Sequence, residues 1–154
     1  MDIADAIVSK GGTVNVGKKF SLFPQDISNI PSKYCLKYAK SFNTKNIFIL
    51  SAKYGLLNLN DIISPYDLTL KKMNKKEKNV WENKVINQCK NNNINFNDKT
   101  IWLCGKEYRK NLINYFPNSY LPLADKGGIG NQIKFMKDSL EKQTKEREKN
   151  EENN

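Results

Sequence analysis

The sequence predicts an α/β protein: a compact single domain with a mainly parallel sheet of three to five strands, flanked by helices. Continuous apolar runs at Ile47–Leu50 and Ile101–Cys104 are typical of strands that are buried on both faces. Each run is followed along the chain by a segment in which apolar residues recur at helical spacing. This alternation favours parallel strands covered by helices, and we expect residues 46–51, 100–104 and 119–123 to form neighbouring parallel strands. The length of 154 residues fits one domain.

The first third of the chain predicts two strands and a helix. Ala4–Val8 can form a first strand, and a glycine-rich loop follows it. Ser32 is a suitable N-cap for a helix that ends near Phe42, with aromatic residues spaced along one face. Asn46–Ser51 is the central strand. Residues 1–31 give the weakest pattern, as a truncated or divergent N-terminal part would.

A long helix is predicted in the middle of the chain. Asn74 is a good N-cap, and Glu77 occupies the capping-box position. The apolar stripe of this helix consists of Val80, Trp81, Val85 and Cys89. In chain order, the elements predicted from here on are a helix over 75–91, a strand over 100–104, a helix over about 106–115, a short strand over 119–123 and a helix that starts near residue 129.

The charge is unevenly distributed along the chain. We place the domain in residues 1–140, because residues 141–154 are charged, lack apolar periodicity and are expected to be frayed or disordered. The formal net charge is +10. From Glu141 onward there are four basic and five acidic residues, so residues 1–140 carry +11. Such a field favours DNA or RNA, although many lysines can also serve only to keep a protein soluble.

Composition also excludes several classes of protein. No apolar stretch reaches about 18 residues and the acidic N-terminus lacks a signal-peptide pattern, so we expect a cytoplasmic protein without a membrane span. Cys35, Cys89 and Cys104 are far apart and fit neither a zinc site nor a disulfide framework. The absence of histidine excludes His-based triads and imidazole bases. We therefore expect no metal and no cofactor.

Residues capable of chemistry gather after the central strand. Ser51, Lys53 and Tyr54 follow it directly, and a proline-preset turn then presents Tyr66 and Asp67. Ligands of parallel α/β sheets bind outside the carboxyl ends of the strands, so these side chains are candidates for a site. The same residues are also compatible with structural roles: a solvated loop lysine, a packing tyrosine and a turn aspartate.

Three predicted strand-to-helix connections contain glycine, at 51–55, 104–106 and 127–130, and parallel strands would bring them to one edge. The helix N-terminus after 127–130 could bind a phosphate, and a purely structural use of the glycines fits equally well. The catalytic candidates are Asp67, as the carboxylate, and Lys53, as a contact for a phosphate or a departing base. The binding candidates are Ser51, Tyr54, Gly55, Tyr66, Gly105, Tyr108, Asp125, Gly128, Gly130 and Gln132.

The order of these motifs resembles a bacterial and phage family known only as a domain of unknown function. The motifs are Ser-Ala-Lys-Tyr-Gly-Leu-Leu at 51–57, Pro-Tyr-Asp at 65–67, Pro-Leu at 122–123 and Ile-Gly-Asn-Gln at 129–132. The resemblance covers roughly residues 46–138. The segment at 47–66 is also distantly similar to the YaaA peroxide-stress family. That similarity implies a cytoplasmic protein associated with DNA and with protection against DNA damage. Separately, the chain resembles glycosylase-like domains that act on modified bases.

The leading hypothesis is a protein that binds a nucleic acid or a nucleotide at the carboxyl edge of its sheet and acts on a base or an N-glycosidic bond. One alternative is a non-catalytic DNA- or RNA-binding stress or phage protein that uses only its basic surface. Another is a small-molecule nucleotide enzyme in which residues 127–130 hold a phosphate. Oligomeric state is not indicated by the sequence.

Overall fold

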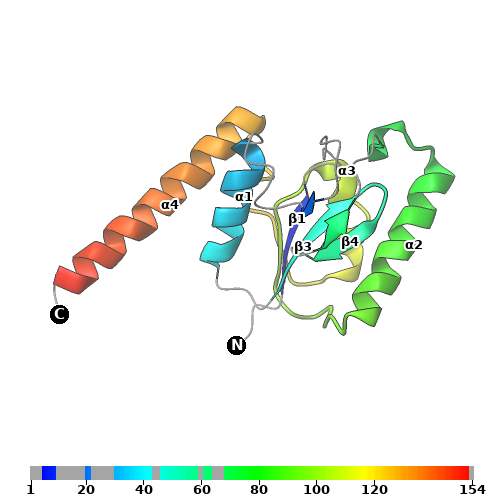
Figure 1. Cartoon of the computed structure of the whole chain (residues 1–154), viewed down its shortest axis with the longest axis horizontal. Helices are drawn as coiled ribbons and strands as arrows, with labels where there is room; N and C mark the ends of the chain where they lie inside the picture. Colours follow the sequence, from blue (N-terminus) through cyan, green and yellow to red (C-terminus); the bar gives the residue numbers. More distant parts are fainter. Residues whose placement is uncertain are drawn as a thin grey trace.

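The structure is a computed structural model that describes residues 5–9, 20–21, 30–42, 46–58, 61–63 and 68–152. The predicted α/β class is confirmed, with more residues in helices than in strands. Helices α1 (Ile30–Ser41) and α4 (Ile129–Glu152) lie on one face of the sheet, and α2 (Lys75–Asn91) lies on the other (Figure 1). The molecule therefore has three layers.

Two short helical turns and one short helix are the other helical segments among the described residues. The 3-10 helices are η1 (Leu70–Lys72) and η2 (Leu112–Tyr115), and the short α-helix is α3 (Lys106–Arg109). The predicted start of α2 is confirmed: Asn74 Oδ1 accepts the Glu77 amide at 2.8 Å, and Glu77 Oε1 accepts the Asn74 amide at 3.3 Å. The single helix predicted over 106–115 is instead α3 followed by η2.

The strands of the structure are β1 (Asp5–Ser9), β2 (Phe20–Ser21), β3 (Asn46–Ser51), β4 (Gly55–Asn58), β5 (Ile62–Ile63), β6 (Thr100–Trp102) and β7 (Ser119–Tyr120). In the main sheet they hydrogen-bond in the order β4-β3-β1-β6-β7. Strand β1 is parallel to both of its neighbours, β6 and β7 are parallel, and β4 is antiparallel to β3. Strands β2 and β5 form a separate antiparallel pair.

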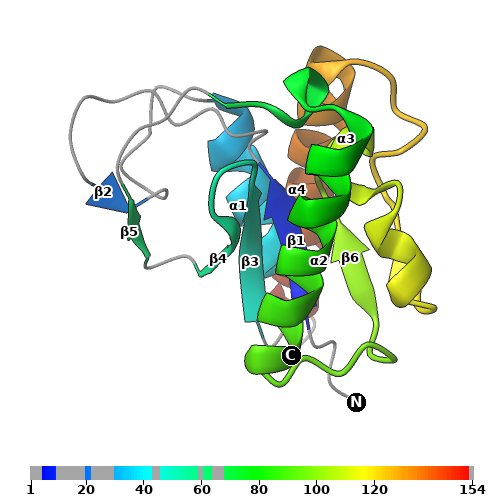
Figure 2. The same ribbon diagram turned by 90° about the vertical axis from the view of Figure 1, so that its right-hand side faces the viewer.

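The sheet differs from the prediction in two ways. The strands at 46–51 and 100–104 are not direct neighbours, because β1 lies between β3 and β6 and pairs with both (Figure 2). Residues 55–58, which carry no helical or strand prediction, form β4 as the second arm of a hairpin. Outside β1, the main sheet consists of two two-stranded pairs, the antiparallel β3/β4 and the parallel β6/β7. Only β1 joins these two pairs, so without β1 the structure does not contain the expected mainly parallel sheet of three to five strands.

Alternation along β3 and β6 divides the core into two clusters, one on each face of the sheet. Phe48 and Leu50 face α2, whereas Ile49 faces α1 and α4. Trp102 and Ile101 are divided in the same way. The two helical layers are therefore held to the sheet by different side chains of the same strands.

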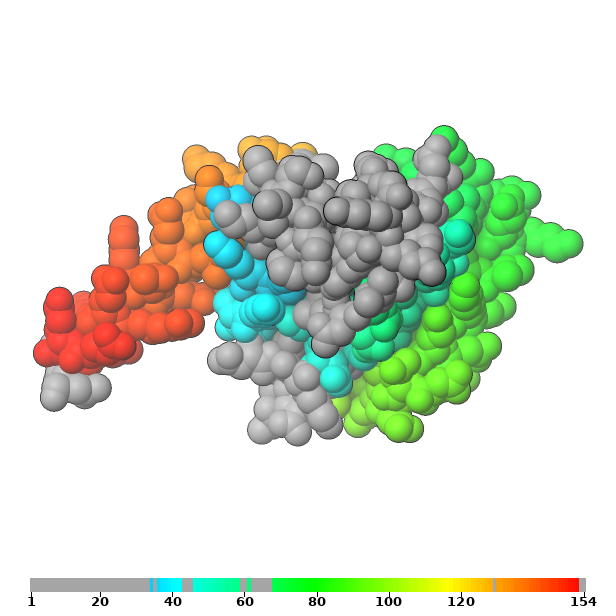
Figure 3. Space-filling view, viewed as in Figure 1, coloured from blue at the N-terminus to red at the C-terminus, as the bar shows by residue number. Residues whose placement is uncertain are grey.

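Helix α4 continues through residues 141–152, past the boundary that we place at residue 140. Its first half packs on α1, where Met136 is buried and the Phe135 ring meets the Tyr38 ring edge-on at 6.0 Å. Its second half is charged and extends away from the rest of the molecule (Figures 1 and 3). Among the described residues, no helix is both long and apolar enough to cross a membrane.

Candidate functional site

Three side chains of α2 hold the turn that follows β3. The Trp81 indole donates to the Ser51 carbonyl at 2.9 Å, and the Lys84 ammonium donates to the Lys53 carbonyl at 3.1 Å. Residues 51–55 form the turn that connects β3 to the antiparallel strand β4. The prediction that this connection leads from a strand to a helix is wrong, because Gly55 reverses the chain and lets Leu56 and Leu57 pair back onto β3.

Gln88 completes this attachment with both ends of its amide. Its nitrogen donates to the Tyr54 carbonyl at 3.0 Å, and its oxygen accepts the Leu56 amide at 2.8 Å. Gly55 lies between these two bonds at φ 78°, and a Cβ there would overlap the Gln88 oxygen. Gly55 therefore has a structural role in the turn.

Of the four predicted site residues in this turn, only Lys53 is exposed. Ser51 is buried, and its hydroxyl oxygen accepts the Tyr54 amide at 3.1 Å. The Tyr54 ring packs against the core on the α1 side of the sheet. The Lys53 ammonium lies 5.3 Å from the centroid of that ring. Lys53 is thus the member of this group that can reach a ligand in solution.

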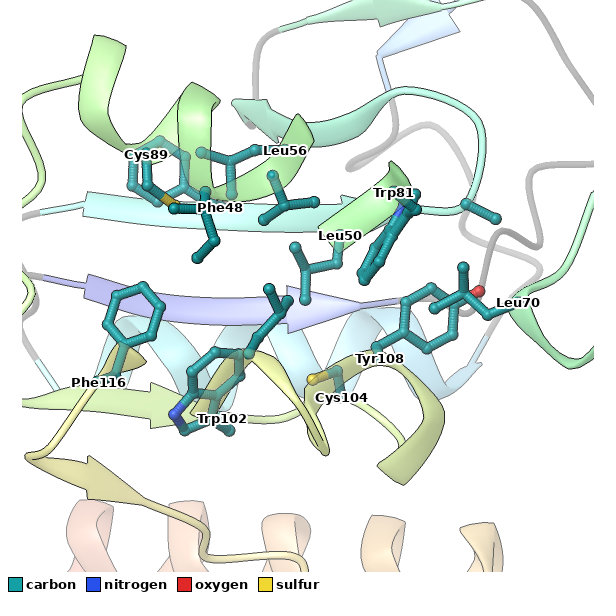
Figure 4. Packing of buried hydrophobic residues seen from close by; sticks show 14 of the residues in the cluster. Phe48, Leu50, Leu56, Leu70, Trp81, Cys89, Trp102, Cys104, Tyr108 and Phe116 are labelled. Atoms are coloured by element: carbon teal, nitrogen blue, oxygen red, sulfur yellow. The ribbon is translucent and has the colours of Figure 1, made fainter. Parts of the chain in front are cut away.

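The carboxyl end of β6 is closed by aromatic packing. Tyr108 is buried, and its ring meets the Trp81 ring edge-on at a centroid distance of 5.8 Å (Figure 4). Its amide donates to the Gly105 carbonyl at 3.1 Å. Tyr108, predicted as a binding candidate, therefore packs between α2 and α3.

The last group of candidates lies where the chain enters α4. The Gln132 amide nitrogen donates to the Gly127 carbonyl at 2.9 Å, and Asp125 is exposed and lies 3.5 Å from the Lys126 ammonium. Open space surrounds Gly128 and Gly130. Leu123 and Ile133, which flank this loop, belong to the α1 side of the core. This group and Tyr108 are therefore anchored on opposite faces of the sheet.

Tyr66 and Asp67 lie outside the described residues, so their position relative to Lys53 stays a prediction.

A different feature, which is not among the predicted site residues, is a concentration of positive charge around the start of α2. We call it the basic face, and it consists of Lys71, Lys72, Lys75, Lys76, Lys78, Lys106, Arg109 and Lys110. The same segments, 70–78 and 106–110, contain two acidic residues, Glu77 and Glu107, which leaves a net charge of +6. Five lysines within residues 71–78 were the available sequence signal.

Contacts between elements join the two segments of the basic face. Helix α3 packs against η1. The Lys78 ammonium bonds the Glu107 carboxylate at 3.1 Å, and the Asn111 amide donates to the Glu82 carboxylate at 2.6 Å. The buried rings of Trp81 and Tyr108 pack against each other and also join α2 to α3. The cations are therefore presented on a rigid support next to the carboxyl ends of β3 and β6.

The placement of these cations is unfavourable for the isolated protein. Lys75, Lys76 and Lys78 occupy three of the first four positions of α2, where the helix macrodipole is positive and favours acidic side chains. A cation in the first turn of a helix typically lowers the stability of the helix by about 0.3–1 kcal/mol relative to a neutral or acidic residue. An anion bound at this surface would remove the repulsion, so the arrangement is suited to a polyanion.

Comparison with known proteins gives one match. The family described as "Family of unknown function (DUF6884)" matches residues 32–138, which include β3, the turn that follows it and the basic face. No curated protein and no solved structure matches the chain. The comparisons thus show no link to the YaaA family.

Proposed function

The chain belongs to the DUF6884 family of unknown function, and we propose that it binds nucleic acid through the basic face. The observation that supports this proposal is the set of eight cations with only two carboxylates, placed where the dipole of α2 adds to the positive field. A phosphate backbone supplies closely spaced negative charges that can neutralise such a surface.

The type of side chain favours contacts with the phosphate backbone rather than reading of the base sequence. Seven of the eight cations are lysines, which act as flexible point charges, whereas bidentate recognition of guanine typically uses arginine. Six of them, including Lys71, Lys72, Lys75 and Lys76, are exposed. We therefore expect binding that depends strongly on salt and weakly on sequence.

The test is a matched pair of fourfold variants. One replaces Lys71, Lys72, Lys75 and Lys76 with Gln, and the control replaces four exposed lysines of α1 and α4, which are Lys37, Lys40, Lys134 and Lys142. Both variants lose the same charge. Fluorescence anisotropy with short single- and double-stranded DNA and RNA is measured at several salt concentrations.

We expect the variant of the basic face to lose most of its affinity, and the slope of log K against log salt to fall by up to roughly 3–4. The control variant should keep most of its affinity and most of its salt dependence. Equal losses in the two variants would contradict a defined interface. Failure of the wild-type protein to bind any of these nucleic acids at low salt would reject the proposal.

A catalytic function at the same edge of the sheet extends this proposal. Lys53 supports it, because its exposed ammonium stands at the carboxyl end of β3 on a turn fixed by α2. Asp67 would be the carboxylate that stabilises positive charge as an N-glycosidic bond breaks. The test is an activity screen against DNA containing modified bases, with wild type and Asp67→Asn.

With an active substrate, we expect Asp67→Asn to lower the single-turnover rate about a hundredfold or more, with little loss of affinity. An unchanged rate would leave Asp67 as a turn residue. A protein that binds nucleic acid but acts on none of the substrates would favour the non-catalytic alternative. The nucleotide-enzyme alternative stays a prediction, and neither Asp125 nor Gln132 has a contact that favours it.

A further inference from the structure

One carboxylate lies among the cations of the basic face and joins two of them. Glu107 Oε2 lies 3.1 Å from the Lys78 ammonium and 3.5 Å from the Lys110 ammonium. The side chains of Glu107 and Lys78 are partly buried, with exposed fractions of 32% and 23%, whereas Lys110 is exposed. Two ammonium groups from different elements therefore converge on one anionic oxygen.

We infer that Lys78 and Lys110 form a phosphate-binding pair that Glu107 occupies in the free protein and that a backbone phosphate occupies in the complex. This inference rests on the proposed function, because it assigns a specific phosphate contact within the basic face. A phosphate oxygen is an anionic acceptor like the carboxylate oxygen, and an ammonium group binds either one as a point charge. Glu107 would thus weaken binding by competing for the two lysines and by repelling the incoming phosphate.

The charge state of Glu107 fits this competition. The hydrogen bond from Lys78 is the main cause that lowers the pKa of Glu107 below its ordinary value, and the charges of Lys110 and Lys78 act in the same direction. Glu107 is therefore ionised at neutral pH.

The two lysines do not need Glu107 to stay in place. Helices α2 and α3 are also joined by the Trp81–Tyr108 ring contact and by the hydrogen bond from Asn111 to Glu82. Neutralising Glu107 should therefore release Lys78 and Lys110 without separating the helices that carry them.

The chain offers a matched control for this effect. Glu82 also belongs to α2, but its carboxylate accepts a hydrogen bond from the uncharged Asn111 amide. Glu107→Gln and Glu82→Gln change the net charge equally, so a general electrostatic gain appears in both. Anisotropy titrations with one single-stranded and one double-stranded DNA at several salt concentrations compare the two variants with wild type.

We expect Glu107→Gln to bind about tenfold more tightly at low salt, with a slope of log K against log salt that is steeper by roughly 1–2. Glu82→Gln should gain about threefold or less. Adding Lys78→Gln to Glu107→Gln should remove most of the gain. Glu107→Ala, which has no amide to replace the carboxylate, should reproduce the gain, and circular dichroism confirms that each variant is folded.

Equal gains in Glu107→Gln and Glu82→Gln would overturn the inference and leave the proposed function standing. So would a loss of affinity in folded Glu107→Gln and Glu107→Ala. Failure of the wild-type protein to bind DNA at low salt is the separate outcome that rejects the proposed function itself.

Discussion

Burial raises the pKa of Tyr38 to about 12, with a smaller contribution from the nearby Tyr120 phenol. The folded state therefore holds the phenolic proton more tightly than the unfolded state, whose Tyr pKa is about 10. This contribution to stability is fully present below pH 10 and is lost as the pH rises towards 12, by up to about 2–3 kcal/mol.

Replacing Tyr38 with Phe should remove that part of the alkaline destabilisation. Urea unfolding at pH 9 and pH 11 measures the free energy of unfolding for wild type and variant. Lysines also titrate in this range, so the difference between the two proteins carries the result. Tyr115→Phe, at an exposed position, should keep the wild-type dependence. If Tyr38→Phe also keeps it, the assignment to Tyr38 is wrong.

Gly55 is a second residue at which the structure makes a sharp prediction. Gly55→Ala places a Cβ at φ 78° and against the Gln88 oxygen, so we expect a loss of about 2–4 kcal/mol in the free energy of unfolding. Gly128→Ala is the control: open space surrounds that position, and we expect a change within about 1 kcal/mol. Denaturant titrations compare the two.

Combining Gly55→Ala with Gln88→Ala separates the two causes of this loss. The second substitution removes the overlap but leaves the backbone conformation, so part of the cost of Gly55→Ala should remain. A Gly55→Ala protein as stable as wild type would show that the turn does not need glycine.

At the scale of elements, α2 is the connection between core, turn and basic face. Its start is fixed by the capping box of Asn74 and Glu77. Asn74→Ala removes the acceptor for the Glu77 amide and should cost about 1 kcal/mol in the free energy of unfolding. Asn83→Ala, an exposed position inside the same helix, should change it by at most about 0.5 kcal/mol. Equal effects at the two positions would contradict the assigned cap.

At the scale of the whole molecule, the distal half of α4 is expected to contribute little to folding or binding. Residues 141–154 carry four basic and five acidic residues, and α4 there extends away from the sheet. A chain that ends at residue 140 should keep its melting temperature within about 4 °C, the shift that corresponds to less than about 1 kcal/mol, and its DNA affinity within about twofold.

The control for this truncation is a chain that ends at residue 130. It lacks Met136 and Phe135, which pack on α1, and we expect it to unfold at a much lower temperature. Thermal denaturation and anisotropy measure both truncations. A large loss of DNA affinity in the chain that ends at residue 140 would place part of the interface on the distal half of α4.

Local patterns predicted most individual elements correctly. The apolar run at 47–50, the cap at Asn74 and the glycine-rich entry to α4 each determine a structure within a few neighbouring residues. Val80 shows where this fails: it fits the apolar stripe of α2, but it is 63% exposed. It lies one turn from Lys76 and Lys84 on the outer side of the helix, and its sequence spacing cannot tell which edge of the stripe the sheet covers.

The sequence by itself determined the α/β class, the start of α2 and an excess of positive charge, because periodicity, capping and charge depend on residue identity at short range. Only the tertiary structure decided that β1 inserts between β3 and β6, that Gly55 turns the chain into a hairpin, and that the charge concentrates around η1, α2 and α3. Each of these depends on contacts between segments far apart in the chain. Register, strand order and surface neighbours follow from such contacts and leave no local pattern.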